Sequence, residues 1–206
     1  MPPLVFIDGN DLRAQEIRRI LPGVELAVEA LQTGFSTSAP EPAHRARDKV
    51  LAHPVAAGCF AEAVDLTTLD GKSLRLELDS ENENRFCKWW RETPARLHLV
   101  VALRRAPGAE IELVTGVCEG RIADQPAGPH VLGWDRLFVP APDGAATEGN
   151  EAETEAQTDG DGDDGVTLAQ LTAAGEIPQF RHAVYAAVGR ALAGVGAGGA
   201  GEAGEA

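Results

Sequence analysis

Glu119-Gly120-Arg121-Ile122 leads through a turn rich in glycine and proline into Leu132-Gly133-Trp134-Asp135-Arg136-Leu137-Phe138-Val139-Pro140. This pattern is typical of a strand edge that faces a ligand. It consists of an apolar run, a turn, an aromatic residue with a carboxylate, and a second apolar run. Trp134 could stack on a planar ligand, and Asp135 could accept a hydrogen bond from that ligand or fix the turn. The alternative that the residues leave open is a core tryptophan beside a capping aspartate.

Apolar patterning on either side of this stretch predicts strands and helices in alternation, and therefore an α/β fold. Continuous or alternating apolar residues predict strands over 4–7, 24–30, 54–66, 73–78, 97–103 and 111–117. Helical spacing predicts helices over 12–21, 43–52, around 86–90, 167–172 and 180–192. The last helix is expected to pack on the sheet.

A chain of 206 residues can form one domain, which we place at residues 1–193. Residues 141–165 contain no aromatic or large aliphatic side chain. They cannot bury enough apolar surface to offset the entropy lost on ordering, so they are expected to form a disordered acidic insertion. Residues 194–206 are expected to be a flexible tail.

The charge distribution limits the partners. The net charge is -14, and no stripe of Lys and Arg with interleaved aromatic residues is present. A nucleic acid polymer is therefore not expected to bind, whereas a small phosphorylated ligand can bind to local arginines and backbone N–H groups. No apolar run approaches the roughly 20 residues of a membrane span, so we expect a cytoplasmic protein that does not bind membranes.

Structural metal sites and disulfides are not indicated. Cys59, Cys87 and Cys118 are far apart and lack a C-x-x-C spacing, so we expect reduced, buried thiols. Residues 159–164 imitate the start of a calcium loop but lack the glycine and the glutamate that such a loop needs, which argues against calcium binding.

Asp8-Gly9-Asn10 is the first candidate site. It follows the strand predicted at 4–7 and opens a helix, whose N-terminal N–H groups and dipole favour phosphate oxygens. Arg13, one turn on, could complete a phosphate clamp. The alternative is an ordinary turn between a strand and a helix.

Glu62 is the second candidate. Hydrolysis of a phosphorylated ligand needs a carboxylate to activate water, or metal ligands to neutralise the phosphoryl oxygens. Glu62 lies near the end of a predicted strand and could serve either purpose. The alternative is a solvated carboxylate at a strand end.

The stretch that opens this section resembles the signature of the inosine triphosphate pyrophosphatases, which hydrolyse non-standard purine nucleoside triphosphates to the monophosphate and pyrophosphate. Thr167 to Leu171 and the turn at Gly9-Asn10 also resemble the family. The resemblance covers nearly the whole chain outside residues 141–165 and the tail. The matching residues of the signature are Gly120, Ile122, Pro126, Gly128, Gly133, Trp134, Asp135, Phe138 and Pro140.

The resemblance implies an α/β fold in which an elongated mixed sheet with flanking helices forms two lobes around a central cleft. It also implies a homodimer, a nucleotide substrate and a Mg²⁺ cofactor. By the resemblance, Gly9, Asn10 and Arg13 bind phosphate, with Arg13 in place of the family's lysine. Asp8 departs from the pattern, since the family has a hydroxyl residue there.

The family's acidic pair falls on Phe60-Ala61, one position before Glu62. The resemblance therefore implies that Glu62 takes over the catalytic role and holds the metal. It places Glu41 near a second metal-binding glutamate of the family.

The residues that read the base in the family are changed here. Arg181 aligns with the arginine of a Ser-His-Arg motif, or Arg181-His182 pairs with His-Arg in reversed order. The family's lysine falls near Gly175. The resemblance thus implies that Leu132, Trp134, Asp135, Arg181 and His182 meet a base other than the usual inosine or xanthine.

Two functions follow as hypotheses. The first is a nucleotide phosphohydrolase that forms a monophosphate and pyrophosphate, retuned to a modified nucleotide and possibly serving a specialised biosynthetic pathway. The second is a catalytically weakened or inactive relative that binds nucleotides or acts as a scaffold.

Lys88-Trp89-Trp90 resembles a segment of the family and is expected to pack in the core or in the dimer contact.

Overall fold

The structure is a computed structural model that describes residues 3–31, 39–53, 57–74, 80–142 and 165–193. The predicted tail lies outside these residues, and so does the predicted acidic insertion except for its ends. The second half of the strand predicted at 73–78 also falls outside them. Only its start is described, where Ser73 forms an antiparallel bridge with Thr67.

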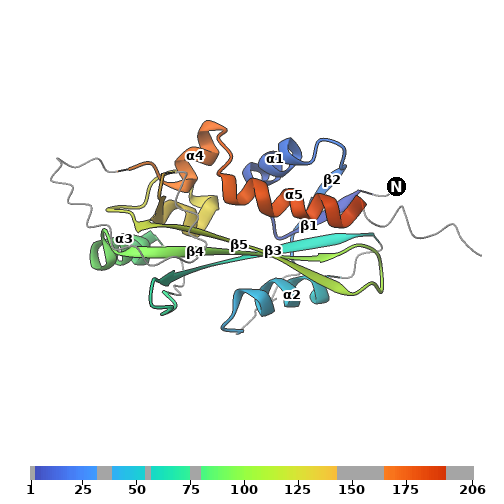
Figure 1. Cartoon of the computed structure of the whole chain (residues 1–206), viewed down its shortest axis with the longest axis horizontal. Helices are drawn as coiled ribbons and strands as arrows, with labels where there is room; N and C mark the ends of the chain where they lie inside the picture. Colours follow the sequence, from blue (N-terminus) through green and yellow to red (C-terminus); the bar gives the residue numbers. More distant parts are fainter. Residues whose placement is uncertain (1–2, 32–38, 54–56, 75–79, 143–164, 194–206) are drawn as a thin grey trace, which may run out of the picture. The chain divides into compact units, whose positions relative to one another are not determined.

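Six strands form one mixed sheet in the order β2-β1-β3-β4-β5-β6 (Figure 1). β1 pairs in parallel with β2 and β3, and β5 pairs antiparallel with β6. This arrangement confirms the predicted α/β class with a mixed sheet. The strands are β1 Leu4–Ile7, β2 Leu26–Glu29, β3 Cys59–Thr68, β4 Pro94–Arg104, β5 Ile111–Ile122 and β6 Phe138–Pro140.

The helices occur in the order that the sequence predicts, and a 3₁₀ segment, η1, precedes β6. They are α1 Asp11–Ile20, α2 Pro42–Ala52, α3 Ser80–Trp90, η1 His130–Leu137, α4 Leu168–Ala174 and α5 Gln179–Ala193. Local signals explain their ends. Asn10 caps α1, a capping box of Thr167 and Gln170 begins α4, and Gly175 ends α4 in the left-handed conformation.

The chain forms two compact units. The first comprises residues 1–63, 99–116 and 180–206, and the second comprises residues 64–98 and 117–179. β3, β4 and β5 contribute residues to both units. The turn at Gly9 and Glu62 belong to the first unit, whereas Trp134 belongs to the second.

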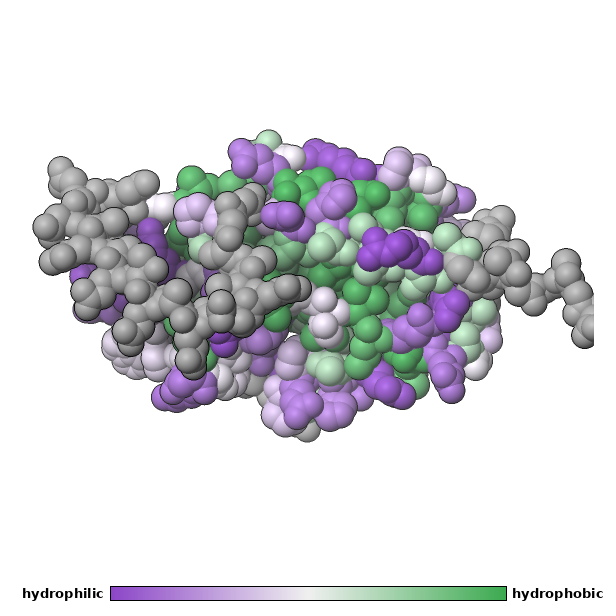
Figure 2. Space-filling model, viewed as in Figure 1, coloured by the Kyte–Doolittle hydropathy of each residue, from purple (hydrophilic) through white to green (hydrophobic). Residues whose placement is uncertain are grey.

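The first unit buries both faces of β1, which explains why its sequence is an unbroken apolar run. Val5 and Ile7 pack in one cluster with Ala46 and Val50 of α2. Figure 1 places α1 and α5 on the other side of the sheet from α2. In the same view, Figure 2 shows hydrophilic residues in purple at the upper and lower margins, where α1 and α2 lie. Both helices are therefore amphipathic, as their spacing predicts.

The cysteines are free thiols, as predicted. Burial raises the pKa of Cys87 to about 12 and also raises the pKa of Cys59, so both stay protonated and unreactive at neutral pH. Cys118 is only half-buried, because it lies on β5, whose residues are mostly half-buried or exposed. The expectation of burial was therefore wrong for Cys118.

His98 on β4 gives the second unit a pH-dependent stability. Its Nε2 lies 2.9 Å from Oγ1 of Thr67, and burial lowers its pKa from the ordinary value of 6.5. The unfolded chain therefore binds a proton more readily than the folded chain, and stability is lost as the pH falls below about 6.5. We expect the melting temperature to drop less between pH 7.5 and pH 5.0 in His98→Gln than in the wild type. Equal drops would contradict this account.

Candidate functional site

The turn after β1 has the geometry that the phosphate-site prediction requires. Asp8 adopts a positive φ of 56°, and a Cβ on Gly9 would overlap the ring of Phe6, so only glycine fits there. The Asn10 side chain accepts a hydrogen bond from the Arg13 N–H at 2.9 Å and begins α1. Gly9, Asn10 and Arg13 therefore lie together where β1 passes into a helix N-terminus.

A buried charge cluster joins three of the predicted site residues. Nε of Arg13 lies 3.6 Å from Oε2 of Glu62, and Arg13 also pairs with Glu16. Nη1 of Arg181, on α5, lies 3.8 Å from the same Glu16 carboxylate. Arg13, Glu16 and Arg181 are each less than 5% exposed. The structure thus brings Arg13, Glu62 and Arg181 to one place, with Glu16 as the link.

Arg181 and His182 are adjacent in sequence but differ in environment. Arg181 is 1% exposed, and its guanidinium lies 5.2 Å from the centre of the Phe180 ring. His182 is exposed. Because Arg181 is buried against Glu16, its first effect is to hold that carboxylate, and through it Arg13, in position. Contact of either residue with a base stays a prediction.

Lys49 is a site residue that sequence reasoning missed. Its Nζ lies 2.8 Å from Oδ2 of Asp8 and donates a hydrogen bond of 3.1 Å to the backbone oxygen of Glu62. Ile7 and Ala61 are register partners in β1 and β3, so Asp8 and Glu62 are the next residues of two neighbouring parallel strands. On α2, Lys49 lies three residues after buried Ala46 and directly before buried Val50. This helical spacing could have predicted that the Lys49 side chain lies near the buried face of the helix.

The residues at this edge do not fit a magnesium ion held by the protein. Glu41 is at the start of α2, and its side chain is 68% exposed and 3.5 Å from His44. In the described ranges, no three His, Cys, Asp or Glu side chains gather in a way that suits a metal ion. The carboxylates nearest the turn, Asp8 and Glu62, already face Lys49 and Arg13 respectively. Magnesium is therefore assigned no role at Asp8 and Glu62.

In the second unit, η1 shows why Gly133 precedes the predicted base-stacking residue. Gly133 has φ 50° and ψ -120°. This backbone conformation interrupts the 3₁₀ segment and is unfavourable for a residue with a side chain. Trp134 is half-buried and packs edge to face on Phe86, with ring centres 5.8 Å apart. Leu132 and Asp135 are 6% and 1% exposed. Because Asp135 is buried, its position favours the role of fixing the turn over that of binding a ligand. Part of the Trp134 side chain stays accessible to solvent.

Arg136 anchors η1 and was not predicted. It is 7% exposed and pairs with the equally buried Glu83 of α3. Its Nε donates to the backbone oxygen of Gly128 at 2.9 Å, and its Nη1 lies 2.9 Å from Nδ1 of His130. One guanidinium therefore ties the segment around Trp134 to α3.

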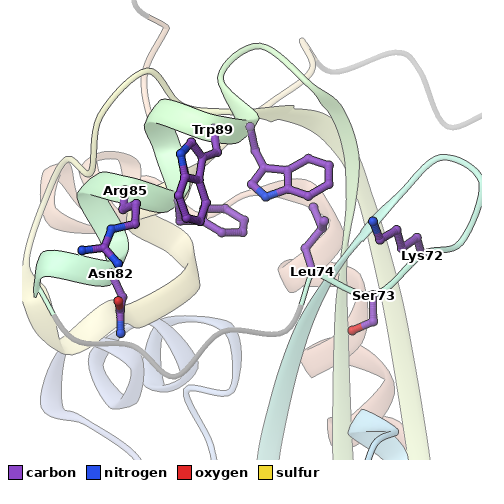
Figure 3. A pocket seen from close by; sticks show the side chains of 8 residues that line it. Lys72, Ser73, Leu74, Asn82, Arg85 and Trp89 are labelled. Carbon is purple, nitrogen blue, oxygen red and sulfur yellow. The ribbon is translucent and has the colours of Figure 1, made fainter.

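The second unit also contains a pocket of about 250 Å³ between α3 and the residues after the Asp70-Gly71 turn. Figure 3 shows Asn82, Arg85 and Trp89 entering it from α3, opposite Leu74. Trp89 is 72% exposed, with the Arg85 guanidinium 5.9 Å from its ring centre. Trp89 was expected to pack in the core or in the dimer contact. Its exposure rules out the core, and the dimer contact stays a prediction.

No helix in the described part of the chain combines the length and the apolar character that a membrane crossing requires.

Comparisons with known sequences point to one family. Residues 73–158 match the sequence model of the Ham1 family. A dITP/XTP pyrophosphatase of Anaeromyxobacter dehalogenans (strain 2CP-C) is 41% identical over 73 residues, which is 35% of this chain and 31% of that protein. A dITP/XTP pyrophosphatase of Anaeromyxobacter sp. (strain Fw109-5) is 33% identical over 101 residues, 47% of this chain and 43% of that protein. The alignments thus span less than half of the relatives' lengths.

Two solved structures have a similar fold over nearly the whole chain. A HAM1 protein from Coxiella burnetii superimposes with a TM-score of 0.56 at 18% identity, covering 95% of this chain and 98% of that one. The Staphylococcus aureus Ham1 protein gives 0.58 at 19% identity, covering 93% and 99%.

The mixed sheet and the segment Gly120–Pro140 thus define an α/β protein with the inosine triphosphatase fold. Residues 73–158, which are less than half of the chain, are thus similar to the Ham1 family, in agreement with the motifs of the sequence. The matched residues 73–158 include Trp134 but neither Arg13 nor Glu62.

Proposed function

We propose that the chain is a nucleoside triphosphate pyrophosphatase that converts a nucleoside triphosphate and water to the monophosphate and pyrophosphate. The observation that carries the proposal is the meeting of Glu62 with Arg13 beside the Gly9 turn, at the carboxyl end of parallel strand β1. Ligands of α/β sheets bind at such ends. The names of the two Anaeromyxobacter relatives support the same reaction.

In this reaction a water oxygen forms a bond to the α-phosphorus, and the bond from that phosphorus to the oxygen leading to the β-phosphorus breaks. The electron pair leaves with pyrophosphate. We assign to Glu62 the proton released by the attacking water, because it is the only carboxylate among the predicted site residues that faces Arg13. Arg13 and the N–H groups at Gly9 and Asn10 hold the phosphates.

We further propose that the base is a modified one from a specialised biosynthetic pathway. Gln179 and Phe180 stand where the resemblance expects base-reading residues, and Arg181 is buried against Glu16. The resemblance assigns base binding to Trp134 and Leu132 as well. We also propose the cytoplasmic location that the sequence predicts.

A panel of natural and modified nucleoside triphosphates tests the proposal, with pyrophosphate release and melting temperature measured side by side. We expect at least one nucleotide both to release pyrophosphate and to raise the melting temperature. If a nucleotide raises the melting temperature and none releases pyrophosphate, the chain is the non-catalytic binder instead.

We also propose the homodimer that the resemblance implies, with Trp89 in the contact. Trp89 is the most exposed large apolar side chain of the described residues, and tryptophan beside arginine is typical of interface hot spots. Trp89→Glu is expected to shift the sedimentation coefficient from dimer to monomer. Leu51→Glu, which changes another exposed apolar residue, is the control. A wild-type monomer, or a dimer in Trp89→Glu, would refute this contact.

A further inference from the structure

We infer that Lys49 supplies, between the end of β1 and Glu62 of β3, the positive charge that a divalent ion would otherwise supply, so that nucleotide phosphates bind here without Mg²⁺. This inference rests on the proposed function and concerns the same site. Three observations carry it: the position of Lys49, the charge balance around it, and the exposure of its partner Asp8.

Lys49 lies between Asp8, which follows β1, and Glu62 within β3. Its ammonium group lies 2.8 Å from the Asp8 carboxylate and 3.1 Å from the Glu62 backbone oxygen. A metal ion held by Asp8 would meet this ammonium group at close range. An ion held by the Glu62 carboxylate would meet the Arg13 guanidinium, whose Nε is 3.6 Å away. Like charges at such distances repel, most strongly where water is excluded.

Among the described residues, the charges of this cluster balance. The carboxylates of Asp8, Glu16 and Glu62 face an equal number of cations, which are Lys49, Arg13 and Arg181. Adding a divalent cation would leave two uncompensated positive charges in a partly buried place. Adding the phosphates of a nucleotide is different, because they can replace a carboxylate as the partner of a cation.

Asp8 is the carboxylate that can be replaced. Its side chain is 45% exposed, whereas that of Lys49 is 21% exposed and those of Arg13 and Glu16 are nearly inaccessible. When a phosphate approaches, Asp8 can turn to water and release Lys49 to the phosphate oxygens. This exchange also gives Asp8 a role in place of the hydroxyl residue that the resemblance leads one to expect.

The experiment is isothermal titration of the full chain, in EDTA and in Mg²⁺, with the panel nucleotide that raises the melting temperature most, made as the analogue with a methylene group between the α and β phosphorus atoms. We expect the wild-type Kd to agree within about twofold in the two buffers. Lys49→Gln keeps a hydrogen-bond donor without the charge, and it should weaken binding in EDTA by about 10- to 100-fold, as for the loss of a charge-assisted hydrogen bond.

Lys49→Arg keeps the charge and should bind within a few-fold of the wild type in EDTA. Arg105→Gln removes a cation of the same unit that pairs with Glu112, and serves as the matched control. Wild-type binding that needs Mg²⁺, or Lys49→Gln binding in EDTA as tightly as the wild type, would overturn the inference alone. No binding of the wild type in either buffer, or to any nucleotide of the panel, would overturn the proposed function and the inference with it.

Discussion

Replacing Glu62 by glutamine is expected to lower kcat for pyrophosphate release by about 10²–10⁴-fold, the usual contribution of a general base. Glutamine has the shape of glutamate but cannot accept the proton of the attacking water. Because the phosphates are assigned to Arg13, Lys49 and the Gly9 turn, the KM should change by only a few-fold. A loss confined to kcat is the signature of an interaction made in the transition state.

Glu112→Gln is the matched control for Glu62→Gln, since it removes a carboxylate of the same unit that pairs with Arg105. It should retain the wild-type kcat. Melting temperatures of both variants show whether each is folded. If a folded Glu62→Gln enzyme keeps more than a third of the wild-type kcat, Glu62 does not accept the proton and the assignment falls.

Replacing Arg136 by methionine is expected to destabilise the chain by about 3–5 kcal/mol, because the change leaves the buried Glu83 carboxylate without its partner. For a chain of this size that corresponds to a fall of roughly 6–20 °C in the melting temperature. The loss should be largest for probes near η1, and in a Trp89→Phe, Trp90→Phe background the fluorescence of Trp134 reports on that segment.

The double change Glu83→Leu with Arg136→Met separates charge burial from packing. Replacing both members of a buried ion pair by apolar residues is often neutral or stabilising, so the double variant should be more stable than Arg136→Met alone. A double variant as unstable as the sum of the two single variants would mean that Glu83 and Arg136 do not act as a pair.

The order of the strands and helices could be predicted from the sequence because each signal is local. The unbroken apolar run of β1, the helical spacing of α5 and the glycine after α4 all depend on neighbours in the chain. The strand predicted over 54–66 corresponds to β3, which begins at Cys59, while residues 54–56 lie outside the described part of the chain. Ala57, just before the strand, carries the same apolar signal as the residues in it.

The long-range ion pairs could not be predicted. Lys49 and Asp8 are 41 positions apart (49 minus 8), and Glu83 and Arg136 are 53 apart. Nothing in the composition near any of these residues shows that the fold brings them together. Arg181 was predicted from the resemblance as a base-binding residue, and only the structure reveals its burial against Glu16.

The central claim is tested most directly by the products formed from the best nucleotide of the panel, identified by phosphorus NMR. The account predicts a nucleoside monophosphate and pyrophosphate in equal amounts, produced by the wild type and strongly reduced in Glu62→Gln. A nucleoside diphosphate with orthophosphate, or no cleavage of any nucleotide that raises the melting temperature, would contradict it.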